Sequence, residues 1–286
     1  MSQLIQLKQR LFTIETIKKL THALRLIAMS SHAQVKTEES HFAAYCTVIT
    51  ELFVRIKRAM PSWHHPIIAP ETAQTTPKLI IIIGAQKGLC GSFNTTLFRY
   101  CLEKIDHTSV DYHYAAIGKK AVAFVTQQLK KPLVFSRAHL STHTCGIVAQ
   151  ELCDFVLYNQ KSYHDVSIVS NHAKTFFVQQ PQQYQLLPVH IPPQISHTVP
   201  EEYLWEQDPH TIITILAREY LIANMSACLL TSLLAEHAAR FISMDSATRN
   251  ADNILEESRI LYNKLRQAKI TKELTELVGS FLTEER

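Results

Sequence analysis

Three of the six glycines in this 286-residue chain lie in one short stretch, GAQKGLCGSFN, from Gly84 to Asn94. Four isoleucines precede it, and an apolar strand followed by a glycine loop and a helix is how many phosphate sites begin. The spacing fails both common templates. A P-loop counted from Gly84 needs a glycine where Leu89 stands, and only the GxxG half of the dinucleotide fingerprint, Gly88 to Gly91, is present. We therefore expect a tight strand-to-helix turn and no nucleotide or other cofactor.

Other reactive side chains are equally weak signals of a catalytic site. His139, His143 and Cys145 have ligand-like spacing, but the segment reads as a loop without an HExxH motif, so solvated histidines are favoured over a metal. Cys90 stands between two glycines and could be a reactive thiol, although a small buried residue is favoured. No GxSxG motif is present. We expect no catalytic, cofactor-binding or metal-binding residues and a protein that is not an enzyme.

The composition narrows the class of protein further. The 29 basic and 25 acidic residues leave a formal charge of +4, too balanced to indicate binding to nucleic acid. Six cysteines without a CxxC pair favour reduced thiols in a cytosolic compartment. We expect no signal peptide. Tyr220–Ala235 carries no charge over sixteen residues, short of the roughly 20 that a membrane span needs. We expect a helix buried by protein and no membrane insertion.

Proline and glycine divide the chain into three parts. Neither occurs in residues 1–60 or 210–278, and both segments are rich in residues that favour helix. A continuous helix of either length would measure roughly 90 to 100 Å, more than the 30 to 40 Å or so of a compact domain. The sequence therefore predicts two long helices, one from each end, that pair antiparallel as a rod.

Apolar residues in both outer segments recur at steps of three or four, which predicts coiled-coil seams of irregular register. The N-terminal run is Leu4, Leu7, Leu11, Ile14, Ile17, Leu20, Leu24 and Ile27. Near the C-terminus there are two runs offset by two residues, first Leu261, Leu265 and Ala268, then Ile270, Leu274, Leu277 and Phe281.

The middle of the chain reads as α/β. Strands are expected at 78–84, 112–117, 133–134 and 166–170, and helices at 92–105, 119–129 and 146–158. Such alternation predicts a Rossmann-like domain with a mostly parallel sheet. The expected divisions are an N-terminal coiled-coil helix (1–60), a linker (61–77), the central α/β domain (78–180), a proline-rich connector (181–209) and a C-terminal coiled-coil helix (210–286).

Three blocks of the chain resemble the gamma subunit family of F-type ATP synthases. HAARFISMDSATRNADN and LYNKLRQAKITKELTELV are close to the family's C-terminal signature, GLCGSFN resembles its central motif, and IETIKKLTHALRLIAMSS is similar to its N-terminal helix. The blocks occur in order and cover the whole chain. The resemblance is to a divergent bacterial member.

The resemblance implies a non-catalytic rotor shaft that couples proton flow to conformational cycling of the catalytic beta subunits. The implied partners are the alpha and beta subunits of the catalytic hexamer, the epsilon subunit and the c-ring. The implied location is peripheral, on the cytoplasmic face of the bacterial inner membrane. Family positions that contact the beta subunit or couple rotation to catalysis fall on Arg266, Gln267, Thr271, Glu273, Glu276, Arg240, Leu24 and Arg25.

Two rival hypotheses make different predictions. A free-standing coiled-coil scaffold would self-associate without alpha and beta chains. A nucleotide-dependent enzyme built on the α/β domain would bind ATP or NAD as an isolated chain, and the failed loop patterns already count against it.

Overall fold

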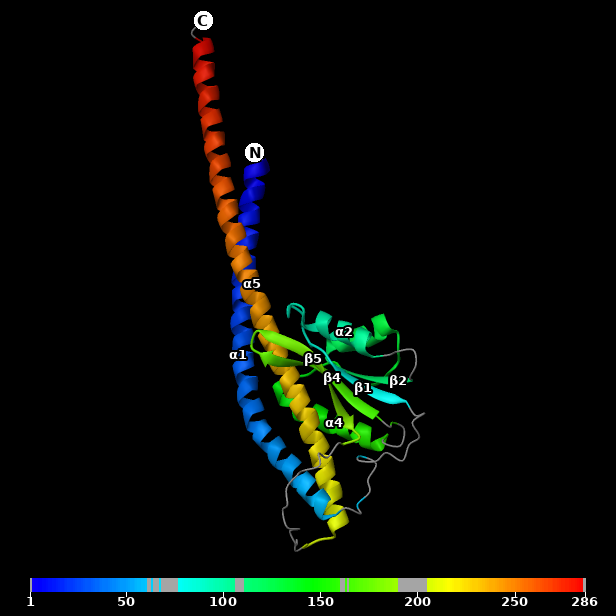
Figure 1. The fold of residues 1–286 in the computed structure, drawn as a ribbon. Coiled ribbons are helices and arrows are strands. Elements are labelled where there is room, and N and C mark those ends of the chain that lie inside the picture. The colour runs from blue at the N-terminus through cyan, green and yellow to red at the C-terminus, as the bar shows by residue number, and fades with distance from the viewer. Residues whose placement is uncertain are drawn as a thin grey trace. The chain divides into compact units, whose positions relative to one another are not determined.

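The computed structural model describes residues 2–60, 63, 67, 77–105, 111–159, 163, 165–189 and 205–284, with side chains described up to residue 276. Contacts divide the chain into two units. Unit 1 comprises Met1–Ala28 and Phe241–Arg286, and unit 2 comprises Met29–Arg240. The two long helices, α1 (Ser2–Ala59) and α5 (Pro209–Glu284), contribute residues to both units (Figure 1).

Unit 2 is built on a five-stranded sheet in the order β3-β2-β1-β4-β5. β1 pairs in parallel with both β2 and β4, β2 pairs in parallel with β3, and β5 runs antiparallel to β4. The strands are β1 (Lys78–Ile83), β2 (Tyr112–Ile117), β3 (Leu133–Arg137), β4 (Asp165–Thr175) and β5 (Val178–Leu187). The shorter helices are α2 (Phe93–Lys104), α3 (Lys119–Ala123), the π-helix η1 (Phe124–Leu129), the 3-10 helix η2 (Thr142–Thr144) and α4 (Cys145–Tyr158).

Both faces of β1 are buried, as the run of isoleucines predicts for a central parallel strand. Ile81 and Ile83 belong to a core cluster that includes residues of α1, α4 and α5. Ile80 and Ile82 belong to a second cluster with residues of α2 and α3. The sheet is therefore covered by helices on both faces, and the expected fold class, long helices with a mostly parallel α/β domain, is confirmed.

The structure corrects two expectations in the middle of the chain. Residues 181–187, expected in an extended connector, belong to β5. Pro181 is tolerated there because β5 is the last strand of the sheet, where a missing N–H need not break a ladder. The expected helix 119–129 also changes from α to π at Phe124. Most of the expected linker 61–77 and residues 190–204 of the connector lie outside the described residues, so the proposed domain boundaries stay predictions.

α5 begins with a cap that the sequence encodes. The Asp208 carboxylate accepts hydrogen bonds from the backbone N–H of Thr211 at 3.0 Å and from its hydroxyl at 3.0 Å. These bonds lower the pKa of Asp208. Pro209 follows at the first helical position, where its fixed φ suits the helix and its missing N–H costs nothing.

The uncharged stretch of α5 packs inside unit 2. Pro209–Glu276 is long and apolar enough to cross a membrane by length and composition, and 44% of its most apolar window is buried. Leu221, Met225 and Leu229 are fully covered members of the large core cluster, together with residues of β1 and α4. These contacts agree with the expectation of a helix buried by protein.

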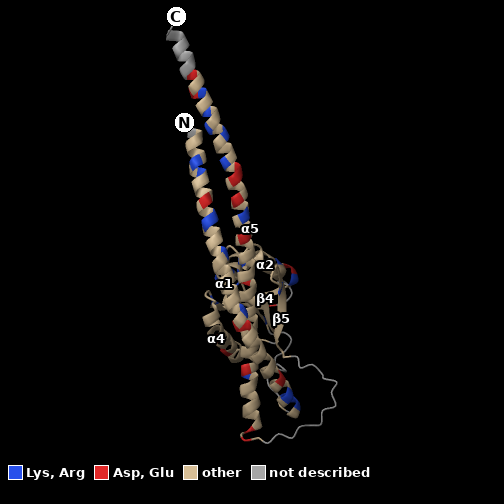
Figure 2. Cartoon of the chain, turned by 90° about the vertical axis from the view of Figure 1, so that its left-hand side faces the viewer, with Lys and Arg blue, Asp and Glu red and all other residues tan. Residues whose placement is uncertain are grey.

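Unit 1 is an antiparallel pair of helices. Lys18 pairs with Asp252, Thr21 with Thr248, and Arg25 with Asp245, so the numbers rise along α1 as they fall along α5. Charged residues occur along both helices in this unit, whereas α5 in unit 2 is mostly free of them (Figure 2).

Candidate functional site

The seam between the helices of unit 1 follows a regular heptad. Buried and partly buried side chains recur at alternating steps of three and four, the spacing of a two-helix coiled coil. On α1 they are Leu4, Leu7, Leu11, Ile14, Lys18, Thr21, Arg25 and Ala28; on α5 they are Phe241, Met244, Thr248, Ala251, Leu255, Ser258, Tyr262, Leu265 and Lys269. Several of these seam positions are polar, which is unusual for a seam selected for stability alone.

Directional bonds cross the polar part of this seam. The Lys18 ammonium lies 2.5 Å from the Asp252 carboxylate, and the Thr248 hydroxyl lies 2.9 Å from the Thr21 hydroxyl. Arg25 donates to Asp245 at 2.6 Å, and Arg249 pairs with the same carboxylate. The two guanidinium groups lower the pKa of Asp245. These pairs set the register of the helices, because each matches one position on α1 to one on α5.

The apolar stripe of α1 leaves the seam, which corrects part of the sequence prediction. Two consecutive steps of three, from Ile14 to Ile17 to Leu20, turn the stripe away, since each residue advances about 100° around a helix. Ile17, Leu20 and Ile27 are consequently 47%, 59% and 61% exposed. On α5, Ile270 and Leu274 are likewise exposed. Leu277 and Phe281 lie outside the described side chains. Unit 1 therefore presents apolar side chains that its own helices leave uncovered.

The predicted contact residues near the C-terminus all lie on this exposed helix surface. Arg266, Gln267, Thr271, Glu273 and Glu276 are exposed. Their few contacts are local: Thr271 donates to the Gln267 carbonyl at 3.0 Å, Lys269 lies 3.4 Å from Glu273, and Lys272 lies 3.7 Å from Glu276. Among the described residues, these side-chain contacts all lie within α5.

The N-terminal pair of predicted residues is placed differently. Leu24 is partly buried, and Arg25 is bound to Asp245 within the seam. Their role at a beta subunit stays a prediction.

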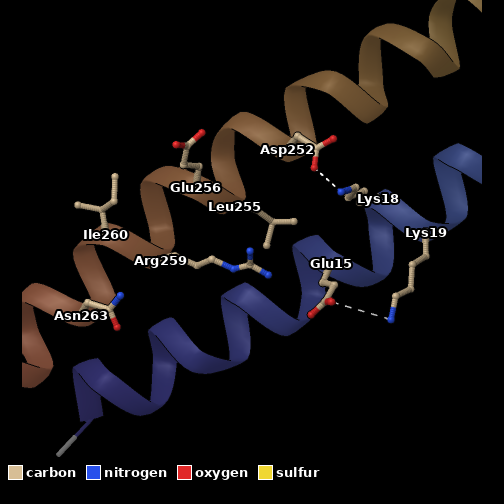
Figure 3. A pocket seen from close by; sticks show the side chains of 9 residues that line it. All are labelled: Glu15, Lys18, Lys19, Asp252, Leu255, Glu256, Arg259, Ile260 and Asn263. Atoms are coloured by element: carbon tan, nitrogen blue, oxygen red, sulfur yellow. Dashed lines mark ion pairs between the residues drawn. The ribbon is translucent and has the colours of Figure 1, made fainter.

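A groove lined by both helices of unit 1 holds six charged side chains. It has a volume of about 640 Å³, and Figure 3 shows its lining residues. Lys18 bridges across to Asp252, while Glu15 and Lys19 on α1 lie 4.0 Å apart. The Arg259 guanidinium points from α5 toward α1 (Figure 3). The opposite charges balance, which favours neither an anionic nor a cationic ligand.

Arg240, also predicted to take part in coupling, lies buried in unit 2. Its side chain is 10% exposed and pairs with Glu236, one turn earlier on α5 and 7% exposed. Arg240 Nε donates to the Gly88 carbonyl at 3.4 Å, and the Gln86 N–H donates to Glu236 Oε2 at 3.4 Å. The pair thus binds the backbone of the glycine turn.

Glu236 was missed by sequence reasoning. A signal was available: Glu236 and Arg240 stand four residues apart directly after the uncharged stretch that ends at Ala235. Spacing i,i+4 places the two on one helix face. What the sequence did not show was that this face is buried.

The glycine turn itself has the form that its composition predicts. Gly91 has φ +56°, and Leu89 also adopts a left-handed conformation at φ +62°. A Cβ on Gly84 would approach the Ala121 Cβ to 3.0 Å, so that glycine permits close packing. Gly88, in contrast, has open space around it.

α5 fills the place where doubly wound folds bind ligands. Such ligands sit at the carboxyl ends of the strands, where strand order reverses. Here β1 lies between β2 and β4, and the turn after β1 packs with Ala235 and Ala239 of α5. The small alanine side chains let the helix approach closely. The crevice that could hold a nucleotide is thus occupied by the chain's own helix.

The remaining reactive candidates do not share one environment: His139 and His143 are exposed, whereas Cys145 is buried. His139 Nδ1 lies 2.7 Å from the Gln86 amide nitrogen, and Cys145 is buried with its thiol 3.8 Å from the Ser226 carbonyl. Among the described residues, no group of three or more His, Cys, Asp or Glu gathers as a metal site. Burial, followed by the Glu236 charge, raises the pKa of Cys90, the opposite of what activates a thiol.

Comparison with known proteins decides the family. A protein-family model described as ATP synthase matches residues 3–282. The chain belongs to this family. The ATP synthase gamma chain of Buchnera aphidicola subsp. Diuraphis noxia is 28% identical over 98% of this chain and 97% of its own length. That of Pelotomaculum thermopropionicum is 28% identical over 98% of both chains. The gamma family suggested by the sequence blocks is confirmed.

Solved structures show the same fold. A chain from the central stalk and c-ring of Tetrahymena thermophila mitochondrial ATP synthase matches with TM-score 0.61 at 17% identity, covering 80% of this chain and 99% of that one. A chain from Euglena gracilis mitochondrial ATP synthase matches with TM-score 0.55 at 16% identity, covering 92% and 95%. Together with the names of the relatives, these matches confirm the expected rotor stalk subunit, a structural member of the synthase and not a catalytic one.

Proposed function

We propose that this gamma family member couples ion-driven rotation to the catalytic beta subunits through the exposed C-terminal surface of α5. Arg266, Gln267, Thr271, Glu273 and Glu276 form the polar part of that surface, with Leu24, Arg25 and Arg240 as further coupling positions. The observation that supports this most directly is that unit 1 leaves both charged and apolar side chains uncovered on a stalk subunit.

The surface suits a contact that must form and release. Ile270 and Leu274 are 47% and 58% exposed, so a partner that covers them gains apolar burial. Exposed ion pairs contribute only about 0 to 1 kcal/mol each. Breaking the Glu273–Lys269 pair to form one with a partner subunit therefore costs little free energy. A rotor that pauses at successive angles needs contacts that form and break in this way.

We infer the partners from the same role. The proposed partners are alpha and beta subunits around the helical pair, with the epsilon subunit and the membrane c-ring on the α/β part. The proposed location is the cytoplasmic face of the bacterial inner membrane, with protons as the coupling ion. The charge balance of the chain and its buried apolar helix support neither nucleic acid nor a lipid core as a partner.

A double substitution in the assembled complex tests the proposal. Arg266→Ala with Gln267→Ala should lower gradient-driven ATP synthesis on the order of tenfold, equivalent to ~1.4 kcal/mol of lost coupling. Stability should not change, because both side chains are exposed. The matched control is Gln9→Ala with Arg10→Ala, the same residue types, adjacent and exposed on α1 of unit 1.

Several outcomes would contradict the proposal. Equal synthesis rates in the two double variants would remove the assigned role of Arg266 and Gln267. If the wild-type chain fails to assemble with alpha and beta chains and self-associates instead, the scaffold hypothesis takes its place. Subunits that co-purify with the chain can be identified by mass spectrometry, which also tests the epsilon and c-ring contacts.

A further inference from the structure

The glycine turn of unit 2 is joined to α5 by a buried, two-way set of polar bonds. Glu236 accepts a hydrogen bond from the Gln86 N–H, and Arg240 donates one to the Gly88 carbonyl; both distances are 3.4 Å. The two side chains also form an ion pair with each other. One carboxylate and one guanidinium thus hold two backbone positions of the same turn.

The turn is in turn fixed to the rest of the α/β part. The Asn94 side-chain oxygen on α2 accepts from the Ala85 N–H at 3.0 Å, and Asn171 on β4 donates to the Phe93 carbonyl at 2.8 Å. Asn171 is fully buried. Hydrogen bonds therefore connect α2 and β4 to the turn after β1, and Glu236 and Arg240 bind the backbone of the same turn.

Apolar packing at the same place could not resist sliding as well. The contacts around the pair come from Ala235, Ala239, Cys90 and Phe93. Alanine side chains interdigitate little, and hydrophobic contact is non-directional. Hydrogen bonds weaken steeply when their angles change. The polar set therefore opposes rotation and translation of α5 against the turn.

We propose that Glu236 and Arg240 are positioning residues that lock the α/β part to α5 and carry torque between them. This inference rests on the proposed rotary function. It assigns Arg240 a contact inside its own chain, where the family resemblance implied a coupling role without a mechanism. α5 runs on as one helix to the proposed contact residues, so a load that enters at the turn reaches them through the backbone.

The chain offers a matched control. Arg218 of α5 donates to Asp154 of α4 at 2.7 Å, which also connects α5 to the α/β part. The side chains of Arg218 and Asp154 are 41% and 60% exposed, whereas those of Arg240 and Glu236 are 10% and 7% exposed. Glu236→Gln and Asp154→Asn each convert a carboxylate that faces an arginine of α5 into an amide, one buried and one in solvent.

The experiment compares loaded with unloaded turnover in the assembled complex. Gradient-driven ATP synthesis in membrane vesicles loads the connection, whereas ATP hydrolysis by the detached hexamer with this chain does not. Glu236→Gln should lower the rate of synthesis about threefold or more. This lies within the roughly two- to thirtyfold range by which residues between two coupled sites change their coupling. Hydrolysis should stay close to wild type, and Asp154→Asn should change neither rate.

A second variant separates the lock from simple folding. Glu236→Leu with Arg240→Met replaces the buried pair by apolar side chains of similar volume, which often preserves stability. The double variant should fold, hydrolyse ATP and still lose synthesis. Restored synthesis would show that packing suffices and would overturn the proposal, as would parallel loss of synthesis and hydrolysis. A wild-type complex that does not couple at all would instead refute the proposed function.

Discussion

α5 behaves as two different helices in the two units of the molecule. In unit 2, Leu221, Met225 and Leu229 are fully covered, and the helix is an element of the core. In unit 1 only about one side chain of α5 in every three or four is buried or partly buried. Polar residues such as Thr248 and Ser258 occupy some of these seam positions. The same backbone therefore serves as scaffold in one unit and as a largely exposed surface in the other. This contrast predicts large losses of stability from substitutions in unit 2 and small ones from substitutions on the exposed surface of unit 1.

Truncation of a leucine should show the largest difference in stability between the two units. Leu229→Ala should lower the free energy of unfolding by about 2 to 5 kcal/mol, because it leaves a cavity in the main cluster. Leu261→Ala, at a position that is 46% exposed, should cost less than about 0.5 kcal/mol. Urea denaturation followed by tryptophan fluorescence for unit 2, and by circular dichroism for both units, measures the difference. Equal costs would mean that unit 1 is packed as tightly as unit 2.

Acid should weaken unit 2 through His237. Burial, then Arg240, His32 and Lys87, lowers the pKa of this imidazole to about 4, below the 6.5 or so of an unfolded chain. Between these values the unfolded state binds a proton that the folded state does not, so stability falls as pH falls. The loss from pH 8 to pH 5 should be about 2 kcal/mol.

Substitution isolates that contribution. His237→Asn should reduce the loss between pH 8 and pH 5, whereas His172→Asn, at an exposed position of β4, should leave it unchanged. Urea titrations at the two pH values measure it. An undiminished loss in His237→Asn would assign the acid sensitivity to other groups.

The threonine pair tests what the polar seam of unit 1 contributes. Thr248→Val alone should cost about 1 kcal/mol, because it removes the hydroxyl that lies 2.9 Å from Thr21. Adding Thr21→Val should restore part of that loss, since two facing valines pack together without either hydroxyl. The recovery is partial because the hydroxyls of Thr21 and Thr248 also bond to the carbonyls of Lys18 at 3.0 Å and Met244 at 2.7 Å. Thermal denaturation of the wild type, the two single variants and the double variant gives the coupling free energy from a double-mutant cycle. Additive costs would show that the two hydroxyls do not depend on each other.

The smallest stability effect is expected at the exposed end of α5. Glu273→Gln with Glu276→Gln should change the free energy of unfolding by less than about 0.5 kcal/mol, because the ion pairs of these carboxylates with Lys269 and Lys272 are accessible to solvent. ATP synthesis should nevertheless fall if these carboxylates meet a partner. A stability loss comparable to that of Leu229→Ala would show that this segment is structural.

Much of the fold was predictable from local signals. The absence of proline and glycine predicted both long helices, and β1 and β2 were predicted from apolar runs that end at Gly84 and Gly118. β5 was missed because its glutamine-rich sequence with Pro181 has no strand pattern; it forms by pairing with β4. Pairing partners far apart in sequence leave little trace in either segment.

The candidate site was less predictable. The exposure of Arg266 and Gln267 follows from an amphipathic helix. The positions that form the seam of unit 1, in contrast, could not be predicted from apolar spacing. Ile17 and Leu20 continue the stripe in sequence yet face away from the partner helix. Lys18 and Thr21 take the seam because they find partners on α5, which periodicity cannot show.

By itself the sequence determined that this chain forms two long helices around an α/β domain, that its glycine turn lacks a phosphate-binding pattern, and that it belongs with rotor subunits. Spacing and breaker residues act locally, so one chain suffices to read them. Only the tertiary structure decided that α5 fills the crevice at the end of β1 and that Glu236 and Arg240 hold the turn there. Those outcomes depend on burial, which brings together residues about 150 positions apart in the chain.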